Sequence, residues 1–178
     1  MSEELNTNFA FRVNDGYIRS VSIIFRLKIR GYLFCTEMRK GFPDKTIKHK
    51  ETHIVGGKVD MIDKTPLECG FREWCEETGY GKDIKEASNT MVSKFNQCYT
   101  LKHDICVSKK QKLYNRFYII EIDECPDYEY LESFITFCDT WKKKDELSLE
   151  SLFFWNNDEF VNRPSNLLEQ LISILPNY

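Results

Sequence analysis

One segment, Gly56 to Tyr80, restricts the possible folds of this chain more than any other. It begins with two adjacent glycines, which predict a turn. Thr65, Pro66 and Glu68 then form the signature of a helix start: a capping hydroxyl, a proline at the first helical position and a carboxylate that can reach back to the cap. Gly79 gives the matching stop. The segment therefore predicts a glycine turn, a short loop and a helix.

Acidic side chains gather on one face of this predicted helix. Successive residues of a helix are turned by about 100°. This rotation places Glu73, Glu76 and Glu77 in one sector, called here the acidic sector. It places Leu67, Phe71 and Trp74 together in another, the apolar sector. Like charges at this spacing repel by about 0.2–0.5 kcal/mol per pair, and no lysine follows three or four residues later to relieve them. An ordinary solvated helix face is one interpretation, and a site for a hard divalent cation is the other.

Two small residues, Cys69 and Gly70, precede the acidic sector by one turn. We expect them to lie beneath it and to leave room for a metal ion and a phosphate group. The agreement between turn, cap, acidic sector and terminal glycine favours the metal site over the solvated face.

The run from Arg72 to Tyr80 resembles the second half of the Nudix box, Arg-Glu-apolar-x-Glu-Glu-x-Gly-apolar, at every position. In the first half, the early glutamate of the family falls near Asp63 or Lys64, and the loop holds one extra residue. The resemblance implies a single-domain α/β/α sandwich with a mixed sheet and the Nudix strand-loop-helix. It also implies an enzyme that hydrolyses a diphosphate linked to another moiety, commonly a nucleoside.

The resemblance further implies a set of metal ligands. Mg²⁺ or Mn²⁺ is expected on the three carboxylates of the acidic sector, Glu73, Glu76 and Glu77, and on the backbone carbonyl of Gly57. Such an ion neutralises phosphate charge and lowers the pKa of a bound water. Arg72 is expected to orient the carboxylates through a salt bridge.

Three carboxylates are candidates for removing the proton of the attacking water. Glu77 belongs to the acidic sector. Glu150 and, as second choice, Glu146 precede an aromatic stretch that ends at Trp155. This stretch resembles the late Nudix segment in which an acid approaches the metals. The sequence leaves the choice among the three open.

Two further segments, His53 to Asp60 and Lys112 to Ile119, are similar to stretches of the mRNA-decapping Nudix enzymes of poxviruses and other large DNA viruses. This resemblance implies a viral protein that acts on capped RNA in the host cytoplasm and releases methylated guanosine diphosphate. Cap recognition requires aromatic stacking on a cationic base. The candidate substrate-binding residues are Lys40, Phe42, Lys58, Tyr114 and Arg116.

Two other functions remain open. The chain can be a small-molecule Nudix hydrolase acting on a nucleoside triphosphate, a dinucleotide polyphosphate, a nucleotide sugar or a diphosphoinositol polyphosphate. It can also be a noncatalytic Nudix-fold module that binds nucleotide or RNA. The polar run from Glu37 to Glu51 bears on this choice, since it reads either as a solvated loop or as a basic surface for polyphosphate or RNA.

The remaining patterns fit one domain of 178 residues. We expect residues 1–15 to form a loose N-terminal segment and residues 16–178 to form the Nudix hydrolase domain. The net charge of −3 argues against a broad nucleic-acid surface. Seven cysteines without a Cys-x-x-Cys pair, no apolar membrane span and no signal-like N-terminus favour a cytoplasmic protein with reduced thiols. The oligomeric state is left open.

Hydrophobic periodicity predicts the other elements. Strands are expected at residues 21–29, 32–35, 91–101, 113–123 and 152–155, and helices at residues 128–141 and after Ser165.

Overall fold

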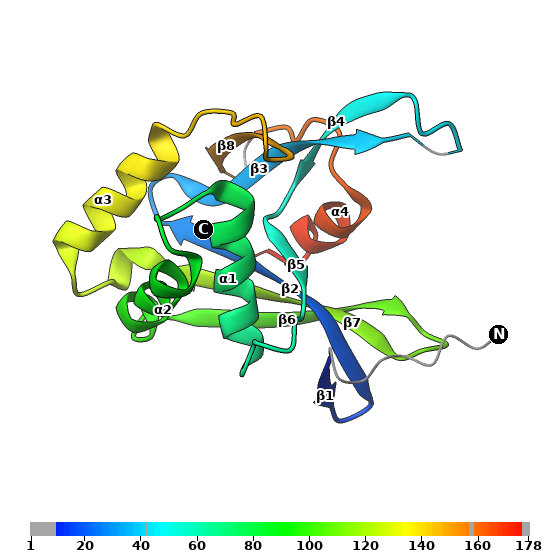
Figure 1. The fold of residues 1–178 in the computed structure, drawn as a ribbon, viewed down its shortest axis with the longest axis horizontal. Helices are drawn as coiled ribbons and strands as arrows, with labels where there is room; N and C mark the ends of the chain where they lie inside the picture. Colours follow the sequence, from blue (N-terminus) through cyan, green and yellow to red (C-terminus); the bar gives the residue numbers. More distant parts are fainter. Residues whose placement is uncertain (1–9, 42, 157–158, 176–178) are drawn as a thin grey trace.

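The computed structural model of the chain describes residues 10–41, 43–156 and 159–175. It forms one mixed sheet with the strand order β4-β3-β2-β7-β6; β1 and β5 also pair with β2, and β8 pairs with β3 (Figure 1). The β2–β7 pair is parallel, whereas β2–β3, β3–β4, β3–β8 and β6–β7 are antiparallel. The elements are β1 (Phe11–Val13), β2 (Gly16–Leu27), β3 (Gly31–Lys40), β4 (Lys48–His53), β5 (Gly56–Lys58), α1 (Pro66–Thr78), α2 (Ile84–Phe95), β6 (Thr100–Ser108), β7 (Leu113–Glu121), the short 3₁₀ helix η2 (Ile122–Glu124), α3 (Tyr128–Asp139), β8 (Leu149–Trp155) and α4 (Asn166–Ile172).

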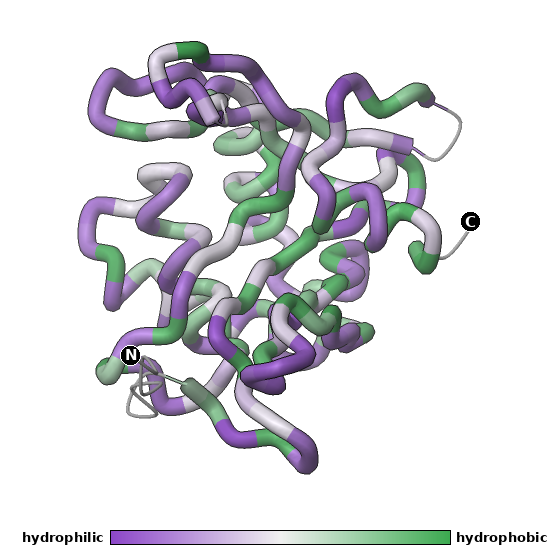
Figure 2. The backbone as a smooth tube through the Cα atoms, turned by 90° about the vertical axis from the view of Figure 1, so that its right-hand side faces the viewer, coloured by the Kyte–Doolittle hydropathy of each residue, from purple (hydrophilic) through white to green (hydrophobic). Residues whose placement is uncertain are grey.

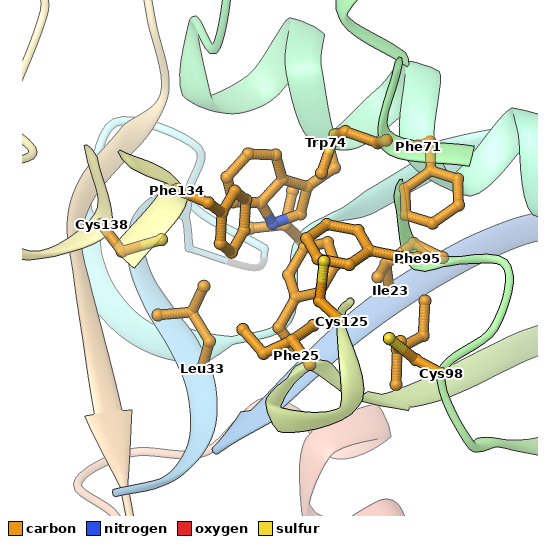
Figure 3. Packing of buried hydrophobic residues seen from close by; sticks show 14 of the residues in the cluster. Ile23, Phe25, Leu33, Phe71, Trp74, Phe95, Cys98, Cys125, Phe134 and Cys138 are labelled. Carbon is orange, nitrogen blue, oxygen red and sulfur yellow. The ribbon is translucent and has the colours of Figure 1, made fainter. Parts of the chain in front are cut away.

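Helices cover both faces of the sheet. One core cluster joins α1, α2 and α3 to the sheet, and a second joins α4 to it. In the first cluster, the ring of Phe25 on β2 lies 5.3 Å from that of Trp74 and 4.8 Å from that of Phe134, measured between centroids (Figure 3). Burial of such a side chain contributes about 1.5–3 kcal/mol. The predicted α/β/α sandwich with a mixed sheet is therefore confirmed.

Hydrophobic segments run through the interior of the molecule, while hydrophilic residues predominate in the outer turns (Figure 2). This distribution matches a fold whose cores lie between sheet and helices. Within residues 10–41, 43–156 and 159–175, no helix is long and apolar enough to cross a membrane.

The strand predicted at residues 91–101 is wrong. Residues 84–95 form α2, and the strand β6 begins only at Thr100. Asp83 caps the helix, because its carboxylate accepts a hydrogen bond from the backbone N–H of Glu86. Met91 and Phe95 then fall on one helical face, four residues apart, and both are buried in the first core cluster.

The polar run from Glu37 to Glu51 is a β-hairpin for most of its length, so the solvated-loop interpretation is wrong outside the turn. β3 extends to Lys40, and β4 begins at Lys48, its Cα partner across the hairpin. β3 also pairs with β8 on its other side. Pairing on both sides outweighs the polar composition, because each backbone N–H and C=O then finds a partner. At the N-terminus, residues 11–13 form β1 against β2, and residues 1–9 lie outside the described part.

The sheet splits next to α1. β2 and β3 pair only at their turn, through Arg26↔Tyr32 and Leu27↔Gly31. Farther from the turn, β5 takes the place beside β2, with Gly57 opposite Val21, while β3 lies between β4 and β8. The divergence leaves a gap between β3 and β5, and the functional site described next lies beside it.

Candidate active site

The helix α1 begins and ends as its sequence predicts. The Thr65 hydroxyl accepts a hydrogen bond from the backbone N–H of Glu68 at 3.2 Å. The Glu68 carboxylate reaches back to the N–H of Lys64 at 3.0 Å, one residue before the cap. Gly79 adopts the left-handed conformation, with φ 72°, and donates to the Cys75 carbonyl. Local sequence alone therefore fixes the position of the acidic sector along the helix.

The apolar face of α1 is buried, and it includes two residues that we expected at the site. Phe71 and Trp74 are 1 % exposed. Cys69 and Gly70 are buried as well, and a side chain on Gly70 would collide with Ile23 of β2. The expectation that Cys69 and Gly70 leave room for metal and phosphate is wrong, because their small size instead lets α1 approach the sheet.

The turn predicted at Gly56 and Gly57 is wrong, because both glycines belong to the strand β5 and pair with β2. This strand touches the acidic sector directly. A Cβ atom added to Gly57 would overlap the carboxylate of Glu73. The three-residue strand β5 therefore brings the Gly57 backbone against α1, and only glycine leaves Glu73 in this position.

Arg72 is the centre of an ion-pair network. Its Nε and Nη2 atoms donate to the two carboxylate oxygens of Asp63 at 2.8 and 2.9 Å. Its Nη1 atom lies 3.0 Å from Glu73 and 3.0 Å from Glu76, and Nη2 also donates to the Lys58 carbonyl. The predicted salt bridge between Arg72 and the acidic sector is confirmed.

Asp63 was not predicted to have a role of its own, although it lies where the early acid of the Nudix box was expected. Its side chain is only 3 % exposed. Burial alone would raise the pKa of Asp63, but the hydrogen bonds from Arg72 and from the Asp60 backbone outweigh burial and lower this pKa. Asp63 therefore stays ionised and holds Arg72 in place.

Negative charge at the acidic sector is only partly compensated. Burial raises the pKa of both Glu73 and Glu77, and the neighbouring Glu76 raises both further. Among the described residues, no three His, Cys, Asp or Glu side chains are already arranged to hold a metal ion. Hard carboxylate oxygens suit Mg²⁺ or Mn²⁺, so the donor set fits the ion by its chemistry. Glu73 and Glu76 must first turn from Arg72.

A polar cavity of about 250 Å³ lies at the split in the sheet, beside the C-terminal end of α1. It is lined by Glu77 of α1, by Gly56 and Ser148, and by Glu37, Arg39 and His53 of the β3–β4 hairpin. Ser148 lies within hydrogen-bonding distance of Glu77, at 3.4 Å. The cavity therefore joins the acidic sector to the hairpin.

The hairpin residues of this cavity form a network of their own. Arg39 Nη2 lies 2.6 Å from Glu37 Oε1, and His53 Nδ1 lies 2.7 Å from the hydroxyl of Ser165. Burial, assisted by Arg39, lowers the pKa of His53 to about 4. Glu37 and Arg39 belong to the run for which a polyphosphate or RNA surface was one interpretation, but neither they nor His53 were predicted individually as site residues. Alternation would have placed Glu37 and Arg39 on one face of β3, had the strand been extended to Lys40.

A second cavity, of about 580 Å³, lies on the α2 side of α1. Its walls include the loop residue Ile62, Glu76 of α1, and Ile84, Asn89 and Val92 of α2. This cavity was not predicted, because residues 91–101 were expected to form a strand and α2 was not expected.

Two predicted substrate-binding residues lie on β7. Tyr114 and Arg116 are on β7, which β2 separates from β3. The Tyr114 hydroxyl donates to Asp15, and Arg116 makes a two-fold ion pair with Asp104. Their role in substrate binding therefore stays a prediction, and both side chains are engaged by carboxylates of the chain itself.

The remaining predicted residues, Glu150, Glu146, Lys40, Lys58 and Phe42, lie outside the lining of the polar cavity or outside the described part of the chain. The carboxylate of Glu150 lies 3.6 Å from Lys143 and does not line the polar cavity, whereas Ser148 does. Glu146 is exposed. The side chains of Lys40 and Lys58 are exposed, at the tip of the hairpin and on β5. Phe42 lies outside the described residues.

No protein-family model matches the chain, and no curated protein matches it. Among solved structures, it is similar to a protein from Listeria monocytogenes described provisionally as a NUDIX hydrolase, with 14 % sequence identity and a TM-score of 0.39. The match covers 88 % of this chain and 95 % of the other.

Proposed function

We propose that this protein is a divalent-metal-dependent Nudix hydrolase that cleaves a phosphoanhydride bond in a nucleoside-diphosphate-linked substrate. One observation carries the proposal. The Glu73 carboxylate lies against the Gly57 backbone, and Arg72 is paired with Glu73 and Glu76 on one side and with Asp63 on the other. Such an arrangement concentrates oxygen ligands where a diphosphate and its cation can bind together.

The residues that would hold Mg²⁺ or Mn²⁺ are Glu73, Glu76, Glu77 and the carbonyl of Gly57. When bound, the ion would offset the phosphate charge and acidify a water molecule. Arg72, held by Asp63, contacts Glu73 and Glu76 and would orient these two carboxylates before the ion binds. The role of Arg72 is thus positioning.

We assign the removal of the water proton to Glu77. Of the three candidates, Glu77 lines the polar cavity, whereas Glu150 is turned to Lys143 and Glu146 is exposed.

For the substrate, we propose the cap of an mRNA, with release of methylated guanosine diphosphate. The observation that favours RNA is the β3–β4 hairpin, on which the exposed Lys40 and Lys48 lie directly opposite each other and Lys50 is exposed nearby. Like charges in this register repel, so a phosphate backbone would stabilise them. A small nucleotide or inositol polyphosphate is the second candidate, because the polar cavity of about 250 Å³ can hold phosphate groups without RNA.

A product assay tests the proposal. Cap-labelled RNA and a panel of nucleotide and inositol polyphosphates are incubated with Mg²⁺ or Mn²⁺ and either the parent protein or Glu77→Gln. Release of methylated guanosine diphosphate by the parent alone supports decapping, and selective cleavage of a small molecule supports the second candidate. Tight nucleotide binding without any turnover would replace hydrolysis by a binding function.

A further inference from the structure

The polar cavity between β3 and α1 suits one part of a ligand better than a whole ligand. Its volume of about 250 Å³ lies below the roughly 300–1,000 Å³ typical of pockets that enclose complete small molecules. Its lining contains no Phe, Tyr or Trp on which a nucleobase could stack. Charged and polar side chains supply most of the surface, so a phosphate group is the chemically matched occupant.

Arg39 is the permanent cation in the lining of this cavity. Its side chain is 46 % exposed, and its contacts with Glu37 and Glu51 are at 2.6 and 3.9 Å. By contrast, Arg72 is 9 % exposed with partners on both sides, and Arg116 is 11 % exposed and bound two-fold to Asp104. A planar guanidinium has five donors and matches the geometry of phosphate, and Arg39 has room to use them.

Glu37 holds Arg39 in position. The Glu37 side chain is 12 % exposed and makes the 2.6 Å contact with Arg39. Glu37 pairs with both β4 and β8, and Arg39, two residues further along β3, pairs with His49 of β4. Because alternate residues of a strand face the same side, Glu37 and Arg39 share the cavity face, and the guanidinium is oriented before any ligand arrives.

The charges of the cavity also predict a condition for binding. Glu37 and Glu77 bring two carboxylates to the lining, and His53 is neutral near pH 7, since its pKa lies at about 4. The single positive charge of Arg39 does not balance the negative charges of both carboxylates and of a phosphate group. A phosphate group in this cavity therefore requires a divalent cation on the acidic sector beside it.

We infer that Arg39 binds a phosphate group of the substrate in this cavity, that Glu37 positions its guanidinium, and that this binding depends on the divalent cation. The inference rests on the proposed function and deepens it. It places the polyphosphate chain between the acidic sector of α1 and the β3–β4 hairpin, and it places the base of a nucleotide outside this cavity.

Calorimetric titration with inorganic pyrophosphate, with and without Mg²⁺, tests the inference without turnover. We expect the parent to bind with Mg²⁺ and to bind at least 10-fold more weakly without it. Arg39→Ala should weaken binding by about 10- to 100-fold, as expected for the loss of a charge-assisted contact. Arg39→Lys should restore only part of it. Arg12→Ala removes the same charge from β1, away from the cavity, and should bind like the parent.

A double-mutant cycle tests the positioning role of Glu37. Glu37→Gln should weaken pyrophosphate binding in the parent. If Glu37 acts through Arg39, the same substitution should have no further effect on binding in Arg39→Ala, whereas a general structural effect would weaken binding in that variant as well. Thermal melts recorded on the same samples show whether each variant is folded.

The inference is overturned if Arg39→Ala and Arg12→Ala bind pyrophosphate equally well, even if the parent is a hydrolase. Conversely, Arg39-dependent binding by a parent that turns over no substrate would support the phosphate site and overturn the proposed hydrolysis. The two failures are therefore distinguishable.

Discussion

The backbone of Gly57 lies so close to the carboxylate of Glu73 that no side chain fits between them. The atoms in the way belong to the flexible end of Glu73, which can swing aside. We therefore expect Gly57→Ala to fold with a loss of less than about 1 kcal/mol but to displace Glu73 and lower turnover by at least about 100-fold.

The adjacent glycine is the matched control. A Cβ atom on Gly56 would meet the backbone carbonyl of Val21 on β2, which cannot move without breaking the pairing. Gly56→Ala should therefore lower the free energy of unfolding by about 1–3 kcal/mol, as urea denaturation can measure. Equal stability losses in the two variants would contradict this difference.

Asp63 should prove essential for stability. Asp63→Asn leaves the buried guanidinium of Arg72 without its two-oxygen partner, and breaking a buried pair in this way costs about 3–5 kcal/mol. Urea denaturation gives the free energy of unfolding. In the same loop, Asp60 is exposed, and Asp60→Asn should change that free energy by less than about 0.5 kcal/mol. A small effect at both positions would show that Arg72 does not depend on Asp63.

His53 predicts a loss of stability in mild acid. Its pKa falls from 6.5 in the unfolded chain to about 4 in the fold, so the unfolded state binds more protons between these values and stability falls as the pH falls. Between pH 7 and pH 5, protonation of His53 should lower the free energy of unfolding by about 2 kcal/mol.

Urea denaturation at pH 7 and pH 5 checks this contribution. His53→Gln should lose about 2 kcal/mol less than the parent over this interval. Since Arg39 helps to lower the pKa of His53, Arg39→Ala should also flatten the pH dependence, by a smaller amount. An unchanged pH dependence in His53→Gln would show that the imidazole takes up its proton without opening the fold.

The lysines of the hairpin distinguish RNA from a small substrate. If capped RNA is the substrate, the double variant Lys48→Ala, Lys50→Ala should bind long capped RNA more weakly than the parent but bind free cap analogue equally well. Two fewer phosphate contacts should reduce the slope of log affinity against log salt by about 1.4. Lys109→Ala with Lys110→Ala removes two exposed charges from the β6–β7 turn and serves as control. The same loss of affinity for RNA and cap analogue would argue against an RNA surface on the hairpin.

How far the sequence predicts the molecule depends on the range of the interactions. The helix α1 was predicted closely because Thr65, Pro66 and Gly79 act within a few residues of themselves. The strand predicted at residues 91–101 fails for an equally local reason: Asp83 caps a helix, and Met91 and Phe95 are buried on one face of it.

The residues that line the polar cavity could not be predicted from local sequence. Its hairpin wall depends on β3 pairing with both β4 and β8, and β8 lies more than a hundred residues from β3 along the chain. Glu37 and Arg39 look like members of a solvated charged run until that pairing is known. The residues that line a site between strands are set by register, and register was not evident from the sequence.

The pairing of β3 with β8 also sets the order in which the site can be completed during synthesis. β5 and α1 leave the ribosome long before β8 and Ser148, which forms part of the cavity wall beside Glu77. A nascent chain that ends before residue 148 can already expose the acidic helix to metal ions, but it lacks that wall of the phosphate cavity. The finished site therefore arises only when the last strand of the sheet has been made.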